Sequence, residues 1–282
     1  SDDVVKGVLK GAKEGSNDQT ETVSIRNEIR NIFEDTIGKI SDFIKKGNYT
    51  QADENVLGGD TNVFNVYGES ITTLVNESTT TTDVNALKTI LGSVKEKSKK
   101  LPKVQAQALQ ELGKIKELKG NIKKMFKALQ DNFMELVSTE NYPGSHENVL
   151  PVWFNSAETL LRDSKNTTDV TALKAILKSM QETSKKWPKV KKEARLERDE
   201  VVKLQREITR RLSSVLKDII RYRNAKNQEL ESLGKEVVKL SKQSRKVNTV
   251  NELTAILDQV KKKEKEWKAL KQTIEKDLRQ YV

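Results

Sequence analysis

The chain has no cysteine among its 282 residues, and it contains few prolines, glycines and aromatic residues. Without cysteine, disulfides, thiolate metal sites and cysteine nucleophiles are all excluded. Only 4 Pro and 13 Gly are available for turns, and 5% of the residues are aromatic, so a sheet protein with many short strands is disfavoured. No stretch approaches the ~18 consecutive apolar residues that span a bilayer. The remaining composition favours a protein made of helices joined by few loops.

Polar residues dominate the composition. The hydrophobic share is 35% and the mean hydropathy is −0.69, which is low for a thick core and typical of narrow helical bundles. A helix of ~35 residues spans roughly 50 Å, so we expect the molecule to be elongated. The predicted fold class is all-α, with tandem helical bundles.

An internal repeat organises the chain. Residues 81–104 recur 86 positions later as residues 167–190, with 17 of 24 positions identical. A weaker third copy begins at Val247, and its Trp267 follows Trp187 of the second copy by 80 positions. Each copy opens with a Thr or Asp that can cap a helix, and an apolar stripe with steps of three and four follows. Pro102 and Pro188 then break or kink the chain.

The repeats predict three units of three helices, over residues 22–101, 102–187 and 188–282. Pairing of helices between adjacent units would instead give two bundles of about four helices, and the sequence leaves both arrangements open. Residues 1–21 contain three glycines and mixed charges. They predict a flexible tether, because such a segment cannot bury enough apolar area to fold.

Residues suited to catalysis are isolated in this sequence. His146 is the only histidine, whereas a general base needs an orienting partner and a metal ion needs several ligands. We interpret Asp199 and Glu200 as charged residues on a helix surface, where Asp199 can form an ion pair with Lys203, four residues later in the sequence. Phosphate-loop, nucleophile-elbow and zinc-protease motifs are missing from the sequence. We therefore predict that the protein is not an enzyme and that it has no catalytic residue, metal site or cofactor.

Positive charge is concentrated in the last third of the chain. Residues 188–282 carry 26 basic and 15 acidic side chains, and residues 1–101 carry 13 and 16. Such a surface suits anionic glycans or lipid head groups, or is simply solvated. A nucleic-acid partner is disfavoured, because few aromatic residues are available there for stacking on bases.

Bulky apolar residues gather in residues 102–187, a range that also contains Phe154. Core packing is one interpretation. The other is a cleft that takes an acyl chain, since Met and aromatic side chains in a bundle interior can open around a linear apolar ligand. The predicted lining is Met125, Phe126, Phe133, Trp153, Met180 and Trp187, with Arg162 near the carboxylate head.

The Lys-, Asn- and Thr-rich composition, the tether, the absence of an initiator Met and the repeated Thr-Thr-Asp-Val and Ile-Leu strings resemble the two-domain helical-bundle surface lipoproteins of relapsing-fever Borrelia. The resemblance implies that residues 1–21 follow a lipidated N-terminal Cys that anchors the protein to the bacterial outer surface. It also implies binding of fatty acids or of a host molecule.

Two functional hypotheses follow. The first is a non-enzymatic protein that binds fatty acids or other apolar ligands within a helical bundle. The second is an adhesin that binds a host protein or glycan through exposed helix faces, including those of the basic last third.

Overall fold

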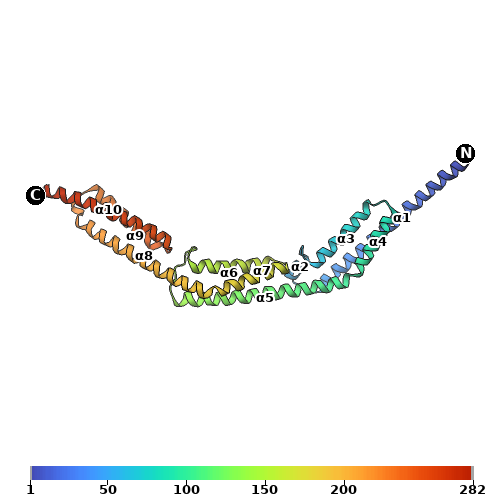
Figure 1. The fold of residues 1–282 in the computed structure, drawn as a ribbon, viewed down its shortest axis with the longest axis horizontal. Coiled ribbons are helices and arrows are strands. Elements are labelled where there is room, and N and C mark those ends of the chain that lie inside the picture. The colour runs from blue at the N-terminus through green and yellow to red at the C-terminus, as the bar shows by residue number, and fades with distance from the viewer. Residues whose placement is uncertain (1, 281–282) are drawn as a thin grey trace. The chain divides into compact units, whose positions relative to one another are not determined.

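The computed structural model describes the backbone of residues 2–280 and the side chains of residues 19–280. Every regular element within this range is a helix (Figure 1), which confirms the predicted all-α class. No helix among the described residues is long and apolar enough to cross a membrane. The elements are α1 (Asp2–Lys46), α2 (Gln51–Leu57), α3 (Val63–Thr80), α4 (Val84–Lys99), α5 (Leu101–Thr139), α6 (Val149–Asn166), α7 (Val170–Lys185), α8 (Trp187–Arg221), the 3-10 turn η1 (Arg223–Ala225), α9 (Gln228–Lys246) and α10 (Val250–Gln280).

Helix starts follow the capping residues seen in the sequence. The carboxylates of Asp83 and Asp169 each accept a hydrogen bond of 2.8 Å from the third backbone N–H of the following helix, at Ala86 and Ala172. These bonds satisfy N–H groups that have no partner inside the helix. Pro102 lies in the first turn of α5, as its equivalent does in α8, where a residue without an N–H is tolerated.

Two segments differ from the prediction. Helix α1 begins at Asp2, so the backbone of residues 2–21 is helical where a flexible tether was expected. Lys, Ala, Leu and Glu in that segment have high helix propensity, and the prediction gave more weight to its three glycines. The second is residues 47–61, where the turn-forming string at residues 58–60 (Gly-Gly-Asp) indicates a connecting segment. The structure has helix α2 there, and reciprocal hydrogen bonds between Thr50 and Asp53 cap its start.

The chain divides into two compact units, each made of two segments. The first comprises Ser1–Ile122 with Asp163–Leu177, and the second comprises Lys123–Arg162 with Lys178–Val282. The limits between units lie inside α5, α6 and α7. The boundaries predicted after residues 101 and 187 instead fall at the starts of the two long helices α5 and α8.

In the first unit, α1, α3 and α4 form a three-helix bundle. Ile29, Leu87 and Val94 are fully buried at its centre, and Ile25 and Ile90 extend the core. Arg26 of α1 closes one end, because its guanidinium donates to the carbonyl oxygens of Ser78 and Thr81 at 3.1 and 2.5 Å.

In the second unit, α8, α9 and α10 form another three-helix bundle. The apolar stripe of α8, at steps of three and four from Val201 to Ile219, is buried against both partners, and Val237, Leu253 and Val260 are fully enclosed. Trp267 of α10 is buried too, and its indole N–H donates to the carboxylate of Asp218 on α8 at 3.1 Å.

Two tertiary contacts occur twice, 86 positions apart. The carboxylate of Glu111 accepts the backbone N–H of Val63 at 3.2 Å, and that of Glu197 accepts the N–H of Val149 at 3.1 Å. Likewise, the Tyr67 hydroxyl donates to the Lys97 carbonyl at 2.7 Å, and the Trp153 indole N–H donates to the Thr183 carbonyl at 3.0 Å. The first pair fixes the start of α3 and α6, and the second fixes the end of α4 and α7.

Candidate functional site

The predicted acyl-chain lining is distributed over four helices of the second unit. Met125, Phe126 and Phe133 of α5 are half-buried, as is Trp187 at the start of α8. Trp153 of α6 and Met180 of α7 are buried, and Arg162 of α6 is exposed.

Aromatic rings of this lining pack directly on one another. The Phe154 ring lies 5.7 Å from the Phe126 ring and stacks on the Phe133 ring at 4.5 Å between centroids. The Trp153 ring lies 4.7 Å from that of Trp187. Phe154 was counted among the bulky residues but left out of the predicted lining. It is the ring that joins Phe126 to Phe133.

None of the five surface hollows that we describe in residues 19–280 is lined by Met125, Phe126, Phe133, Met180 or Arg162. Trp187 borders a small hollow of about 200 Å³ with mostly polar walls. The rings therefore occupy the space between their helices, and entry of an acyl chain there would require them to separate. That site stays a prediction.

A larger apolar groove lies elsewhere in the second unit, where α8 ends and α9 begins. Its volume is about 800 Å³, within the range of roughly 300–1,000 Å³ that is typical of small-molecule sites. Its apolar wall comes from both helices and includes two side chains that are well exposed, Ile220 at 60% and Val238 at 40%. The apolar lining is Leu216, Ile219, Ile220, Leu230 and Val238.

Gly234 explains why this groove is open. Counting 80 positions back along the repeat, Gly234 of α9 corresponds to Phe154 of α6, and Ile219 of α8 corresponds to Phe133 of α5 by the spacing of 86. Phe154 stacks on Phe133, whereas a Cβ atom at Gly234 would meet only Ile219, at 3.7 Å. The groove thus lies where the second repeat places a phenyl ring.

Cations surround the apolar wall of the groove. Arg223, Lys226 and Lys235 line it together with one acid, Glu231. Glu231 is paired with Lys235 at 3.7 Å on the exposed surface of α9. The backbone of Lys226 is left-handed, with φ of 46°, and this residue connects η1 to α9. Arg223 and Lys226 have no ion pair among the described residues, so the groove combines an apolar wall with available positive charge.

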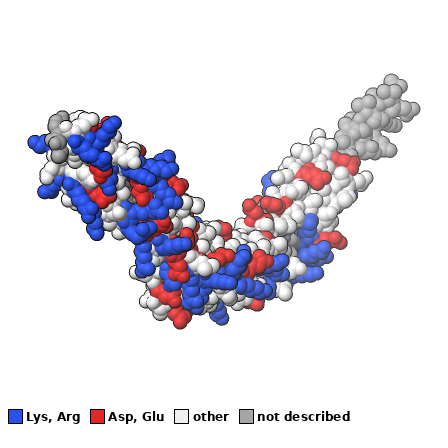
Figure 2. Space-filling model, turned by 60° about the vertical axis from the view of Figure 1, so that its left-hand side comes forward, with Lys and Arg blue, Asp and Glu red and all other residues white. Residues whose placement is uncertain are grey.

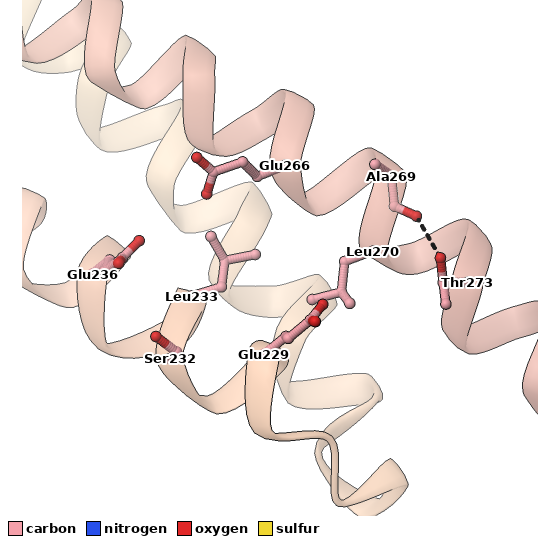
Figure 3. Close-up of a pocket in the computed structure, with 8 residues that line it drawn as sticks. All are labelled: Glu229, Ser232, Leu233, Glu236, Glu266, Ala269, Leu270 and Thr273. Carbon is pink, nitrogen blue, oxygen red and sulfur yellow. Dashed lines mark hydrogen bonds between the residues drawn. The ribbon is translucent and has the colours of Figure 1, made fainter.

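A second hollow in the same bundle has the opposite charge. It lies between α9 and α10 and has a volume of about 470 Å³. Figure 3 shows Leu233 and Leu270 at its base and the carboxylates of Glu229, Glu236 and Glu266 around it. This hollow does not suit an anionic ligand.

The other candidate residues remain apart. His146 is exposed in the connection between α5 and α6, and no group of three or more His, Cys, Asp or Glu side chains in the described structure could hold a metal ion. Asp199 pairs with its neighbour Arg198 at 3.2 Å. The predicted pair of Asp199 with Lys203 is not among the ion pairs of the described residues.

Comparisons with known proteins add no relative. No family model, no curated protein and no solved structure matches the chain.

Proposed function

We propose that this protein is a non-enzymatic binding protein for long-chain carboxylates, and that the ligand lies in the groove between α8 and α9. The observation that carries the proposal is the replacement of a packed ring by Gly234, which leaves an apolar groove bordered by cations. An acyl chain would lie against Ile219, Leu230 and Val238, and its carboxylate would be near Arg223 or Lys226.

The energetics favour a ligand with these two parts. Each methylene removed from water contributes up to about 0.8 kcal/mol, which raises affinity as much as roughly fourfold per carbon. An exposed cation adds less, because solvent screens it. We therefore expect affinity to be set mainly by chain length, with the carboxylate fixing the orientation.

The test places a phenyl ring in the groove, at the position where the second repeat has Phe154. In Gly234→Phe the new ring would take the place of the ligand, and we expect palmitate binding to fall at least tenfold in titration calorimetry. Gly68→Phe is the matched control, since Gly68 of α3 is the first repeat's equivalent of Gly234 and has open space around it. Circular dichroism checks that both variants fold.

Chain length and head group provide a second readout. Affinity should rise from laurate to palmitate, and Lys226→Gln should weaken palmitate more than hexadecanol. Palmitate binding that survives Gly234→Phe but is lost in Phe126→Gln would place the ligand at the predicted ring cluster. No measurable palmitate binding would refute the proposal.

We also propose that the protein is displayed on a bacterial outer surface through a lipidated cysteine N-terminal to Ser1. The composition and the helical bundles support this assignment to the relapsing-fever Borrelia lipoproteins. Mass spectrometry of the full-length protein from its source would detect an acylated N-terminal cysteine, and an unmodified N-terminus would contradict the proposal.

A further inference from the structure

A row of five cations follows the outer face of α8. The α8 cation row consists of Lys203, Arg206, Arg210, Lys217 and Arg221, with steps of three, four, seven and four residues. These steps keep the side chains on one side of a helix, opposite the buried stripe from Val201 to Ile219. All five are exposed, and the row is about 27 Å long at 1.5 Å per residue.

Some cations of the second unit are neutralised by ion pairs, whereas those of the row are not. Arg211 forms ion pairs with Glu264, at 2.7 Å, and with Glu207, and Arg198 forms an ion pair with Glu140 at 2.7 Å. No ion pair within residues 19–280 includes a member of the row. The row therefore carries positive charge that the fold itself does not use. Figure 2 shows Lys and Arg covering much of the visible face of this bundle, with smaller acidic patches between them.

Helix α5 shows that the fold does not require these charges. The buried positions of α5 and α8 correspond at a spacing of 86, for example Ile122 with Ile208 and Leu129 with Val215. At the same spacing, the equivalents of the row on α5 contain three acids, one glycine and one lysine. They are Glu117, Gly120, Lys124, Asp131 and Glu135. An equivalent solvent face is thus acidic on α5 and wholly basic on α8.

We propose that the α8 cation row binds a linear sulfated polysaccharide. Guanidinium groups bind tetrahedral oxyanions through paired N–H donors, and lysines add charge. An extended polymer with regularly spaced sulfates can follow a straight row and meet several cations at once. Ser213 and Ser214 occupy the centre of the row and are small and exposed, so they leave room for the chain.

The composition of the row distinguishes this partner from other polyanions. No aromatic side chain lies in the row, so unpaired bases have nothing to stack on. Val202 and Ile220 are exposed beside the two ends of the row, but they are too far apart along α8 to form the continuous apolar face that a helix inserts into a membrane surface beside its cations. The row is separate from the α8–α9 groove, because none of its five members lines that groove.

The experiment uses the whole chain and heparin oligosaccharides of defined length on a biosensor. Lys203→Gln with Lys217→Gln removes two charges from the row. Lys239→Gln with Lys262→Gln removes two charges from the groove between α9 and α10 and is the matched control. We expect the row variant to weaken heparin binding at least tenfold and the control to weaken it less than threefold.

Three further readouts complete the test. Affinity should rise as oligosaccharides lengthen to about the 27 Å of the row and then level off, and it should fall as salt screens the charges. Equal losses in both variants would show that binding depends only on net charge and would overturn the proposal. Tighter binding to single-stranded RNA, or to phosphatidylserine vesicles, than to heparin would also overturn it, as would heparin binding unaffected by the row variant.

Discussion

At the scale of single residues, the carboxylate of Glu140 fixes the end of helix α5 to helix α8. It follows the last residue of α5 and accepts hydrogen bonds from the hydroxyl of Tyr142 and from Arg195 and Arg198 of α8. The Tyr142 hydroxyl and the two guanidinium groups hold the pKa of the Glu140 carboxyl below its usual range, although partial desolvation opposes them. Arg198 also lies over the Tyr142 ring, 5.1 Å from its centroid.

This cluster predicts a specific acid dependence of stability. Because the pKa of Glu140 is lowered in the folded state, its contribution is complete above the ordinary value of about 4.3 and is lost as pH falls through the lowered pKa. We expect Glu140→Gln to lower the melting temperature at pH 7 and to lower it less at pH 3, because protonation of Glu140 removes the contribution progressively as the pH falls. Thermal melts across pH for this variant and for Glu135→Gln, whose side chain has no ion pair in the described structure, provide the measurement. An effect of Glu140→Gln that is equal at both pH values would contradict this account.

Gly234 is the residue whose role sequence reasoning missed. A glycine inside a helix lowers helix stability by about 1 kcal/mol relative to alanine, so its presence is notable. The residue type does not show which side chains surround it. The signal was in the repeat, where Gly234 falls at the place of Phe154. Reading it required knowing that Phe154 stacks on Phe133, and hydrophobic periodicity does not specify which rings meet.

At the scale of helices, the contacts that occur twice predict additive losses of stability. The carboxylates of Glu111 and Glu197 each accept a hydrogen bond from the first backbone N–H of the short helix that precedes a repeat, α3 or α6. Replacing either by Gln should cost about 1 kcal/mol, since the amide is a weaker acceptor. The two changes share no partner, so the double variant should lose about the sum.

Urea unfolding of the three variants provides the measurement, and the third repeat provides the control. Asp277 occupies the place of Glu197 at a spacing of 80 and is exposed, and the start of α9 is capped by Asn227 instead. Asp277→Asn should therefore change stability by less than 0.5 kcal/mol. If it destabilises the protein as much as Glu197→Gln, the contact is not what holds these helix starts.

Helices were predictable from this sequence because their cores repeat with a period close to 3.6 and their starts carry capping residues. The finer limits were not. Hydrophobicity alone would place Ile37 of α1 in the core, yet Thr36 is the buried residue, and its hydroxyl donates to the Ile32 carbonyl at 2.8 Å. Steps of four, three and four from Ile25 lead to residue 36, so helix geometry outweighs hydrophobicity there. The candidate groove depends on how α8 and α9 pack, which periodicity within one helix does not fix.

At the scale of the whole molecule, the limits of the compact units fall within helices. Lys123 and Lys178 each open a segment of the second unit, and both lie inside helices, α5 and α7. The left-handed backbone of Asn48 and Lys226 instead marks connections between helices. Backbone in a continuous helix must unfold locally before a protease can cut it.

A lysine-specific protease should therefore cut first next to these connections. We expect early cleavage after Lys46 and Lys226 under native conditions, and cleavage after Lys123 and Lys178 only at much longer times. Mass spectrometry of the fragments over time provides the measurement. Early cleavage at Lys123 or Lys178 would show that the unit limits are weak points of the chain.

The opposite faces of α8 also constrain how this protein can change in length. Each residue of a helix advances it by about 100°, so one residue inserted next to Ser213 would turn every later side chain by that angle. Val215 and Ile219 would leave the core, and Lys217 and Arg221 would leave the line of Lys203 and Arg210. Insertions that preserve the core must come close to a whole number of turns, such as about seven, eleven or eighteen residues, and those same insertions keep the cations aligned. Selection for a packed core would thus keep the cations of the α8 cation row aligned, even without selection on the row itself.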